Sequence, residues 1–278
     1  MVTKAKDFQQ KRRNRAIAIE ETAINKVRCT RIPGFLHCQN KTIQLLHKKL
    51  LREAKTLNEY RSEQFKRAVL GCNDKEKELL KKYLRAYNNA DIITKEKCYS
   101  MFMNNKQISE KLKCIIGNYA DNDMEVGILL DLHEMKYIDN NNIDDFEGRC
   151  YWVIRGGVRC VEMKSNPEAR VRLSASSKNR LLFMHNHPST GTFSAEDFKM
   201  FCNNKTLYAM TIIGNDGGNY ILNKQAGFDD SVALLEYGNL IMNKYKDKTN
   251  NATLAMRDIL NNANKLKLNY IKGGKRDD

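Results

Sequence analysis

The hydrophobic pattern of the chain changes near residue 120, and this change constrains the fold more than any other feature of the sequence. Over residues 41–69 apolar side chains recur every three or four positions with no Gly or Pro between them, which predicts one long helix. After residue 121 short apolar runs of strand length follow one another, separated by polar or glycine-containing segments. The two patterns predict an α+β protein with a mainly helical first part and a mixed second part.

Local signals predict the remaining elements. Further helices are expected over residues 73–84, 108–119, 194–203 and 254–268. Strands are expected over residues 126–130, 151–154, 181–184, 207–213 and 220–222. The glycine-rich segment 214–218 is typical of a hairpin connection, and the Pro-Gly pair within residues 31–34 is expected to end an earlier basic helix.

Charge divides the chain in a similar way. Residues 1–110 hold 25 Lys and Arg against 12 Asp and Glu, residues 111–243 hold 14 against 17, and residues 244–278 hold 9 against 4. We therefore expect a basic, mainly helical region over 1–118, a near-neutral domain over 119–243, and a basic C-terminal helix and tail over 244–278. The basic excess in 1–110 predicts either a nucleic acid or another acidic partner, or only a solvated basic face.

The sequence also indicates the compartment. No apolar run reaches the roughly 18 residues of a membrane-spanning helix, and the N-terminal segment lacks the apolar stretch of a signal peptide. We therefore expect a soluble, cytoplasmic protein with no membrane partner. The eight cysteines lie far apart without a Cys-x-x-Cys pair, which argues against a thiolate zinc ribbon and predicts free thiols.

The candidate metal-binding and catalytic residues cluster in the segment 184–197, which has the sequence MHNHPSTGTFSAED. His185 and His187 are two residues apart at the end of an apolar strand, so strand alternation directs both imidazoles to one side of the sheet. Ser194 and Asp197 are three residues apart in the first turn of a helix and are neighbours on its surface. Two neutral imidazoles and one carboxylate suit Zn²⁺ and leave a fourth position for water, whose pKa falls to about 7 on the metal.

The pattern His-x-His-Pro followed by Ser-x-x-Asp resembles the JAMM (JAB1/MPN+) zinc metallopeptidases, and HNHPS is most similar to their RadC-like and phage or mobile-element branch. The resemblance covers about residues 120–225. It implies a curved mixed β-sheet flanked by helices, here preceded by the basic helical domain. It also implies Zn²⁺ held by His185, His187 and Asp197, with Ser194 stabilising the oxyanion of the reaction. The loop between His187 and Ser194 has six residues, fewer than in many members of the family.

The resemblance further implies an upstream glutamate that acts as general base. Glu125 stands at the start of an apolar run, in the order Glu125-Val126-Gly127, which is similar to the family's sequence around its general base. We therefore expect Glu125 to be the base. Glu134, Glu147 and Glu162 remain alternatives, because the connection to the histidines varies between branches of the family.

These residues predict a hydrolase, a JAMM-type metalloprotease or isopeptidase that acts on a protein or peptide substrate, for example a ubiquitin-like conjugate. The alternative is a RadC-like or phage-associated protein that binds nucleic acid or has a structural role, in which the basic helices do the main work and the metal site is secondary. A third interpretation assigns no metal: His185 and His187 are then polar residues at a strand end, and Ser194 is only a helix cap.

Overall fold

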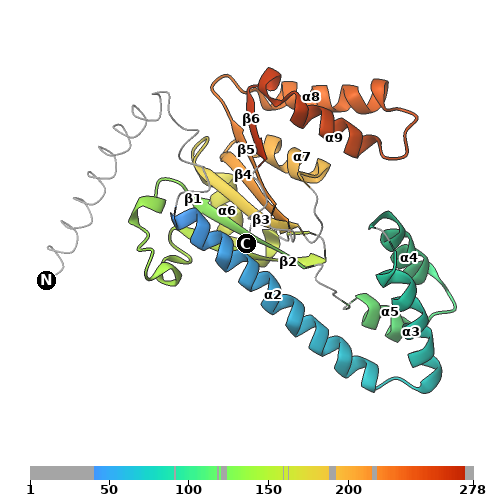
Figure 1. The fold of residues 1–278 in the computed structure, drawn as a ribbon. Helices are drawn as coiled ribbons and strands as arrows, with labels where there is room; N and C mark the ends of the chain where they lie inside the picture. The colour runs from blue at the N-terminus through green and yellow to red at the C-terminus, as the bar shows by residue number, and fades with distance from the viewer. Residues whose placement is uncertain are drawn as a thin grey trace, which may run out of the picture. The chain divides into compact units, whose positions relative to one another are not determined.

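The computed structural model describes residues 41–272 apart from residues 91, 118, 120–123, 159, 162, 188–191 and 215–217. The predicted break within 31–34 and the basic segment before it lie outside these residues. The described chain is α+β, with helices and a six-stranded mixed sheet (Figure 1). The sheet and the helices α3 to α9 all belong to one compact unit, residues 45–278.

The first part of the described chain is helical, as predicted. It consists of α2 (Lys41–Leu70), α3 (Asp74–Asn88), α4 (Ile92–Asn104) and α5 (Glu110–Gly117). A capping box starts α3, because the Asn73 side chain accepts from the Glu76 N–H while the Glu76 carboxylate accepts from the Asn73 N–H. The later helices enclose a core of their own, made of Cys72, Leu80, Tyr83, Tyr87, Phe102, Ile108, Leu112, Ile115 and Ile116.

The sheet has the strand order β2-β1-β3-β4-β5-β6, and among these neighbours only β3 and β4 run parallel. Its strands are β1 (Met124–Asp131), β2 (Tyr151–Val158), β3 (Leu181–His187), β4 (Leu207–Gly214), β5 (Asn219–Lys224) and β6 (Leu268–Lys272). The first five confirm the predicted strands. The segment 214–218 joins two antiparallel strands, as a hairpin connection does.

The last strand was not predicted. The helical pattern expected through residue 268 ends earlier, because α9 (Asn251–Asn261) stops and a short 3-10 turn follows. Lys267 then adopts the left-handed conformation, with φ 57°, which turns the chain into β6. Part of the predicted C-terminal segment 244–278 therefore belongs to the same sheet as the central domain.

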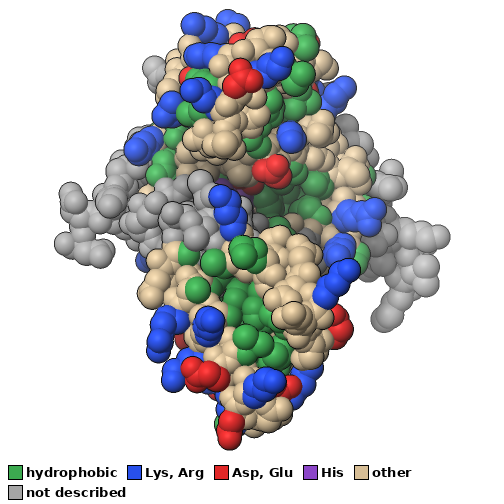
Figure 2. Space-filling view, turned by 90° about the vertical axis from the view of Figure 1, so that its right-hand side faces the viewer, with side chains coloured by type: hydrophobic (Ala, Val, Ile, Leu, Met, Phe, Trp, Pro, Cys, Tyr) green, Lys and Arg blue, Asp and Glu red, His purple; other side chains and the backbone are tan. Residues whose placement is uncertain are grey.

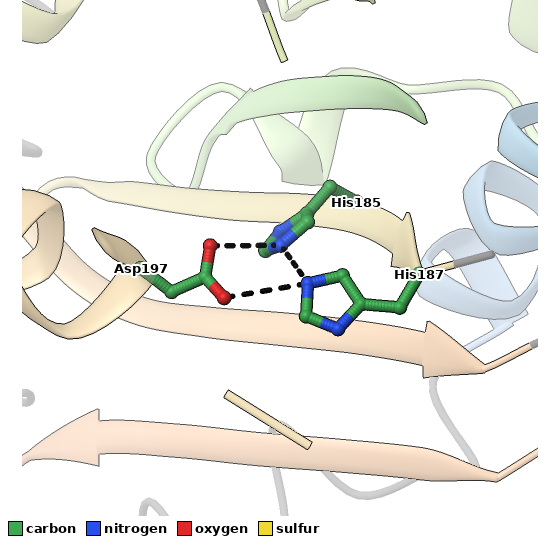
Figure 3. A group of neighbouring side chains, drawn as sticks. All are labelled: His185, His187 and Asp197. Atoms are coloured by element: carbon green, nitrogen blue, oxygen red, sulfur yellow. Dashed lines mark hydrogen bonds and ion pairs between the residues drawn. The ribbon is translucent and has the colours of Figure 1, made fainter. Parts of the chain in front are cut away.

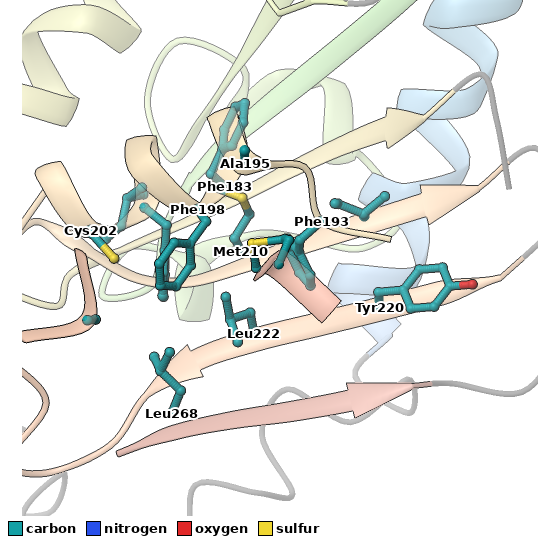
Figure 4. Packing of buried hydrophobic residues seen from close by; sticks show 14 of the residues in the cluster. Phe183, Phe193, Ala195, Phe198, Cys202, Met210, Tyr220, Leu222 and Leu268 are labelled. Carbon is teal, nitrogen blue, oxygen red and sulfur yellow. The ribbon is translucent and has the colours of Figure 1, made fainter. Parts of the chain in front are cut away.

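The remaining helices lie between or after the strands. They are α6 (Pro167–Ala175), α7 (Ala195–Asn203) and α8 (Asp230–Asn239), with the short turns η1 (Met135–Tyr137), η2 (Ile143–Phe146), η3 (Met163–Ser165), η4 (Leu240–Lys244) and η5 (Ala263–Leu266). Only α7 was predicted by residue range. Helices α6 to α9 share one core with the sheet (Figure 4). In this core Phe198 and Phe201 of α7 are fully buried. Burying each such ring stabilises the fold by about 1.5–3 kcal/mol.

The long helix α2 packs against the opposite face of the sheet. His47 Nε2 lies 3.2 Å from Oγ1 of Thr211, a β4 residue whose neighbours Met210 and Ile212 face the α7 side. Because strand residues alternate between faces, Thr211 and α2 are on the other side. The sheet is thus covered on both faces, which explains why β1 and β3 are buried along their whole length.

Two further sequence expectations concern membrane-spanning helices and the cysteines. Among the described helices, none is long and apolar enough to cross a membrane. The six cysteines that the structure describes are free thiols, as predicted: Cys72, Cys98, Cys114, Cys150, Cys160 and Cys202. The other two, Cys29 and Cys38, lie outside the described residues.

A buried lysine links α2 to the sheet region. Lys49 is 7% exposed, and its Nζ lies 2.7 Å from Asp144 Oδ1 and 3.1 Å from Glu147 Oε2. Burial alone would lower the pKa of Lys49, but its hydrogen bonds to the two carboxylates raise the pKa above its ordinary value. In turn, the hydrogen bond from Lys49 lowers the pKa of the Asp144 carboxyl. The ammonium group of Lys49 therefore stays charged although the side chain is buried.

We predict that the paired change Asp144→Asn and Glu147→Gln lowers the free energy of unfolding by about 1–2 kcal/mol at pH 7, because the buried ammonium loses both carboxylates and water screens part of the effect. Folding lowers the pKa of Asp144, so the ionised carboxylate stabilises the folded state at pH values above its ordinary pKa. This stabilisation is lost as the pH falls through the lowered pKa of the folded state. The difference in free energy of unfolding between the wild type and the variant should therefore become smaller below about pH 4.

Urea unfolding at pH 7 and pH 3 measures both quantities. Asp145→Asn is the matched control, because this neighbouring carboxylate is exposed and forms no ion pair among the described residues. It should leave the free energy of unfolding unchanged within about 0.5 kcal/mol. A deficit of the double variant that is equally large at pH 3 would contradict this account.

Candidate metal centre

His185 and His187 lie at the C-terminal end of β3. In the sheet, Gly127 of β1 is opposite His185, and Ile212 and Gly214 of β4 lie beside the two histidines. Their imidazoles are on the same face, as alternation predicts, with ring centroids 4.9 Å apart and the two Nε2 atoms 3.1 Å apart (Figure 3). The residues are only 1% and 8% exposed.

The carboxylate comes from the helix that follows. Asp197 is in the first turn of α7, which connects the parallel strands β3 and β4, so this helix begins near the end at which β3 stops. Asp197 Oδ1 lies 3.1 Å from His185 Nε2, and Oδ2 lies 3.3 Å from His187 Nε2 (Figure 3). The three predicted ligands therefore meet at the carboxyl end of a strand, the usual position of ligand sites in βαβ units.

Ser194 is the N-cap of α7 and holds Asp197 in place. Its Oγ accepts from the Asp197 N–H at 3.1 Å, and the Asp197 Oδ2 atom accepts from the Ser194 N–H at 2.8 Å and from the hydroxyl at 2.7 Å. These reciprocal bonds form a capping box. The serine thus lies beside the cluster as predicted, and its hydroxyl hydrogen is used by the carboxylate.

The electrostatics of the cluster favour a charged carboxylate. Burial alone would raise the pKa of Asp197, but His185 and then His187, through charge and hydrogen bonds, hold it well below its ordinary value. Asp197 is therefore an anion at neutral pH. Metal ligands must be deprotonated, so an ionised Asp197 beside two imidazole nitrogens is in the state that binds a cation.

The spacing of the donor atoms fits a small divalent ion. All three lie within 4.8 Å of one another. In a tetrahedral Zn²⁺ site with bonds of about 2.0–2.1 Å, neighbouring ligand atoms are about 3.3 Å apart. The two Nε2 atoms are 3.1 Å apart, and Asp197 approaches His185 with Oδ1 at 3.1 Å and His187 with Oδ2 at 3.3 Å, so each of these distances is close to this value. Two lone pairs repel at such a distance, so the nitrogens need a proton or a cation between them.

Glu125 lies on the strand next to the histidines. It is a buried residue of β1, and Gly127, two positions later, is opposite His185. The regular pairing of β1 with β3 ends at Gly127, so Glu125 lies just beyond it, at the end of the strand that neighbours the histidines. Its carboxylate is not a member of the three-residue ligand cluster.

The two described alternatives to Glu125 lie elsewhere. Glu134 Oε1 lies 3.3 Å from the Arg180 guanidinium, at the start of β3, which is about 17 Å along the strand from His185. Glu147 pairs with Lys49 of α2, on the other face of the sheet. Glu162 lies outside the described residues. Among the described candidates, Glu125 is therefore the glutamate that adjoins the histidine strand.

Gly127 and Phe183 support the site, and sequence reasoning assigned neither a role. The Phe183 ring stacks on the His185 ring, with centroids 5.2 Å apart and an interplanar angle of 22°. A Cβ at position 127 would lie 2.7 Å from the Phe183 ring, so only glycine leaves room for it. A glycine inside an apolar strand is the sequence signal for such a close approach.

We predict that the chain binds one Zn²⁺. At a free zinc concentration about 100 times the dissociation constant, binding should raise the free energy of unfolding by about 2.7 kcal/mol. His187→Ala should remove this gain because it deletes a ligand, and Asp197→Asn should reduce it strongly because it removes the negative charge of the carboxylate. Unfolding in zinc buffer and in EDTA, together with metal analysis, measures the effect. His133→Ala is the control histidine and should keep the gain; equal stabilisation of His187→Ala would contradict the site.

Comparisons of the chain with models of protein families, with curated proteins and with solved structures found no match. The resemblance to JAMM metallopeptidases is therefore carried by the motif within residues 184–197 and by Glu125. The assignment of the site depends in the same way on the local geometry of His185, His187 and Asp197.

Proposed function

We propose that the protein is a zinc-dependent hydrolase of the JAMM type that cleaves a peptide or isopeptide bond. The observation that carries this proposal is the convergence of His185, His187 and Asp197 at one strand end, with Glu125 on the neighbouring strand. The substrate class is a protein or peptide, of which a ubiquitin-like conjugate is one example.

Each ligand contributes a defined atom. His185 and His187 would hold Zn²⁺ through Nε2, and Asp197 through a carboxylate oxygen. The bound ion supplies a Lewis acid and a water molecule that ionises near neutral pH. Phe183 restricts the rotation of the His185 ring by stacking on it, and Ser194 fixes the carboxylate of Asp197 by two hydrogen bonds. Both contacts reduce the reorganisation that substrate binding would otherwise require.

Glu125 is assigned the proton transfer. As an ionised carboxylate it would accept a proton from the attacking water and deliver it to the leaving amine. The position of Glu125 in β1, the strand next to the histidine strand, supports this role, because a general base must come within hydrogen-bond distance of the attacking water. Glu134 and Glu147 are engaged with cations at other places in the fold.

The role of Ser194 divides into two parts. Its contacts support a holding role, since both its N–H and its hydroxyl donate to Asp197 Oδ2. Stabilisation of an oxyanion, which the family resemblance implies, requires the hydroxyl to turn away from Asp197 toward the substrate. The two roles are compatible only if the backbone N–H keeps the carboxylate in place during that turn.

The alternative function, nucleic-acid binding through residues 1–110, stays a prediction. Residues 1–40 of this region lie outside the described residues, and several basic side chains of the described helices pair with acidic neighbours, as in Lys55–Glu59, Arg67–Glu63 and Lys111–Glu76. Figure 2 shows one face, on which Lys and Arg are scattered among acidic and apolar side chains. Among the described residues of 41–110, no contact favours that function over the hydrolase.

We predict that Glu125→Gln lowers kcat about 10²- to 10⁴-fold and leaves zinc binding unchanged, because the amide cannot accept the proton. His187→Ala should abolish zinc binding and activity together. An internally quenched peptide library and a set of ubiquitin-like conjugates, analysed by fluorescence and mass spectrometry, measure the activity. Glu134→Gln is the control and should keep kcat within about twofold.

Two outcomes would contradict the proposal at different points. If the zinc-loaded protein cleaves none of these substrates, the hydrolase assignment is wrong. If it cleaves one of them and Glu125→Gln is as active as the wild type, the metal site stands and Glu125 is not the base.

A further inference from the structure

The backbone around Glu125 leaves the regular ladder of the sheet. Strands β1 and β3 pair from Asp131 opposite Leu181 to Gly127 opposite His185, and this pairing ends there. On the other side, the register between β1 and β2 shifts between Met124 and Val126. The proposed base therefore lies at an irregular strand end, just beyond the last regular pair of β1 and β3.

One side chain bonds the backbone on both sides of Glu125. Asn186 Oδ1 accepts from the Val126 N–H at 2.7 Å, and Asn186 Nδ2 donates to the Met124 carbonyl at 3.0 Å. The two backbone groups flank Glu125 directly. An amide side chain offers one acceptor and two donors at the spacing of a peptide group, so a single Asn can pair with both.

Asn186 cannot serve the cluster directly. It lies between His185 and His187 in β3, and alternation directs its side chain away from their face. It is 2% exposed, so it does not meet solvent or a substrate on its own side. Its amide instead bonds the backbone of β1.

Two other elements hold the same segment. Asn58 of α2 accepts from the Met124 N–H at 3.2 Å. On the β2 side, a Cβ at Gly156 would lie 2.2 Å from the Glu125 carbonyl oxygen, so the strands approach too closely there for any side chain. The backbone of Met124–Val126 is thus bounded by β2, β3 and α2.

We infer that Asn186 is a positioning residue for Glu125, holding the base beside the metal ligands through the backbone on each side of it. This inference rests on the proposed hydrolase function. A misplacement of a catalytic group by about 1 Å can cost about 10²-fold in rate, so the loss of both amide bonds should be visible in kcat. Binding of metal should not change, because no ligand is altered.

The test is a double-mutant cycle, with the internally quenched peptide that the wild type cleaves fastest as the probe. Asn186→Ala should lower kcat about 10- to 100-fold while KM and the zinc dissociation constant stay within about twofold. In the Glu125→Gln background the same change should cause no further loss, because the group that it positions is already inactive. An equal loss in both backgrounds would overturn the inference.

Asn223→Ala is the matched control. Asn223 is also a buried Asn of the same sheet, and its amide bonds Tyr208 and Asn269 instead of β1. It should keep kcat within about twofold. If Asn186→Ala does not fold, Asn186→Thr carries the same cycle, since a β-branched residue is favoured in a strand and cannot span both backbone groups.

Amide hydrogen exchange of the zinc-free protein separates this inference from the proposed function. The Val126 amide should exchange at least about 10-fold faster in Asn186→Ala, while the Leu129 amide, within the regular ladder, keeps its rate. Unchanged exchange at Val126 would overturn the inference even if the enzyme is active. A wild type that binds zinc and cleaves no substrate would overturn the hydrolase function, while exchange still reports whether Asn186 holds this backbone.

Discussion

The approach of two imidazole nitrogens to 3.1 Å is the constraint on which the site depends. Nitrogen lone pairs repel at this distance, so the pair is stable only with a proton or a cation between the rings. The fold enforces the approach, because β3 is buried along its length, Phe183 stacks on His185, and Asp197 faces both nitrogens. A divalent ion relieves the repulsion and uses the anionic carboxylate at the same time.

The position of the site follows from the topology of the sheet. The parallel pair β3 and β4 needs a crossover, and α7 provides it. The first turn of α7 therefore returns to the strand end that carries the histidines, and its capping box serves two purposes. Ser194 stabilises the helix start and also fixes the carboxylate of Asp197 toward His185 and His187. Helix formation and site assembly thus use the same residues.

The sequence was sufficient to predict the elements with a local signal. The spacing of His185 and His187 predicted one face, and the Ser194–Asp197 spacing predicted a shared helix turn, because both depend only on strand and helix periods. Strand β6 could not be predicted, since the apolar spacing of residues 254–268 is helical throughout. In the structure α9 ends at Asn261, and the left-handed residue Lys267 precedes the strand. The contacts of Asn186 could not be predicted from the sequence either, because they join residues 60 and 62 positions apart.

X-ray absorption at the zinc edge measures whether two histidines and a carboxylate bind the metal in one small cluster. We expect two imidazole nitrogens together with oxygen ligands, all at about 2.0–2.2 Å from the metal, and no sulfur. In His187→Ala this signature should be lost. Sulfur scattering at about 2.3 Å, or a zinc signal that is the same in wild type and His187→Ala, would contradict the account.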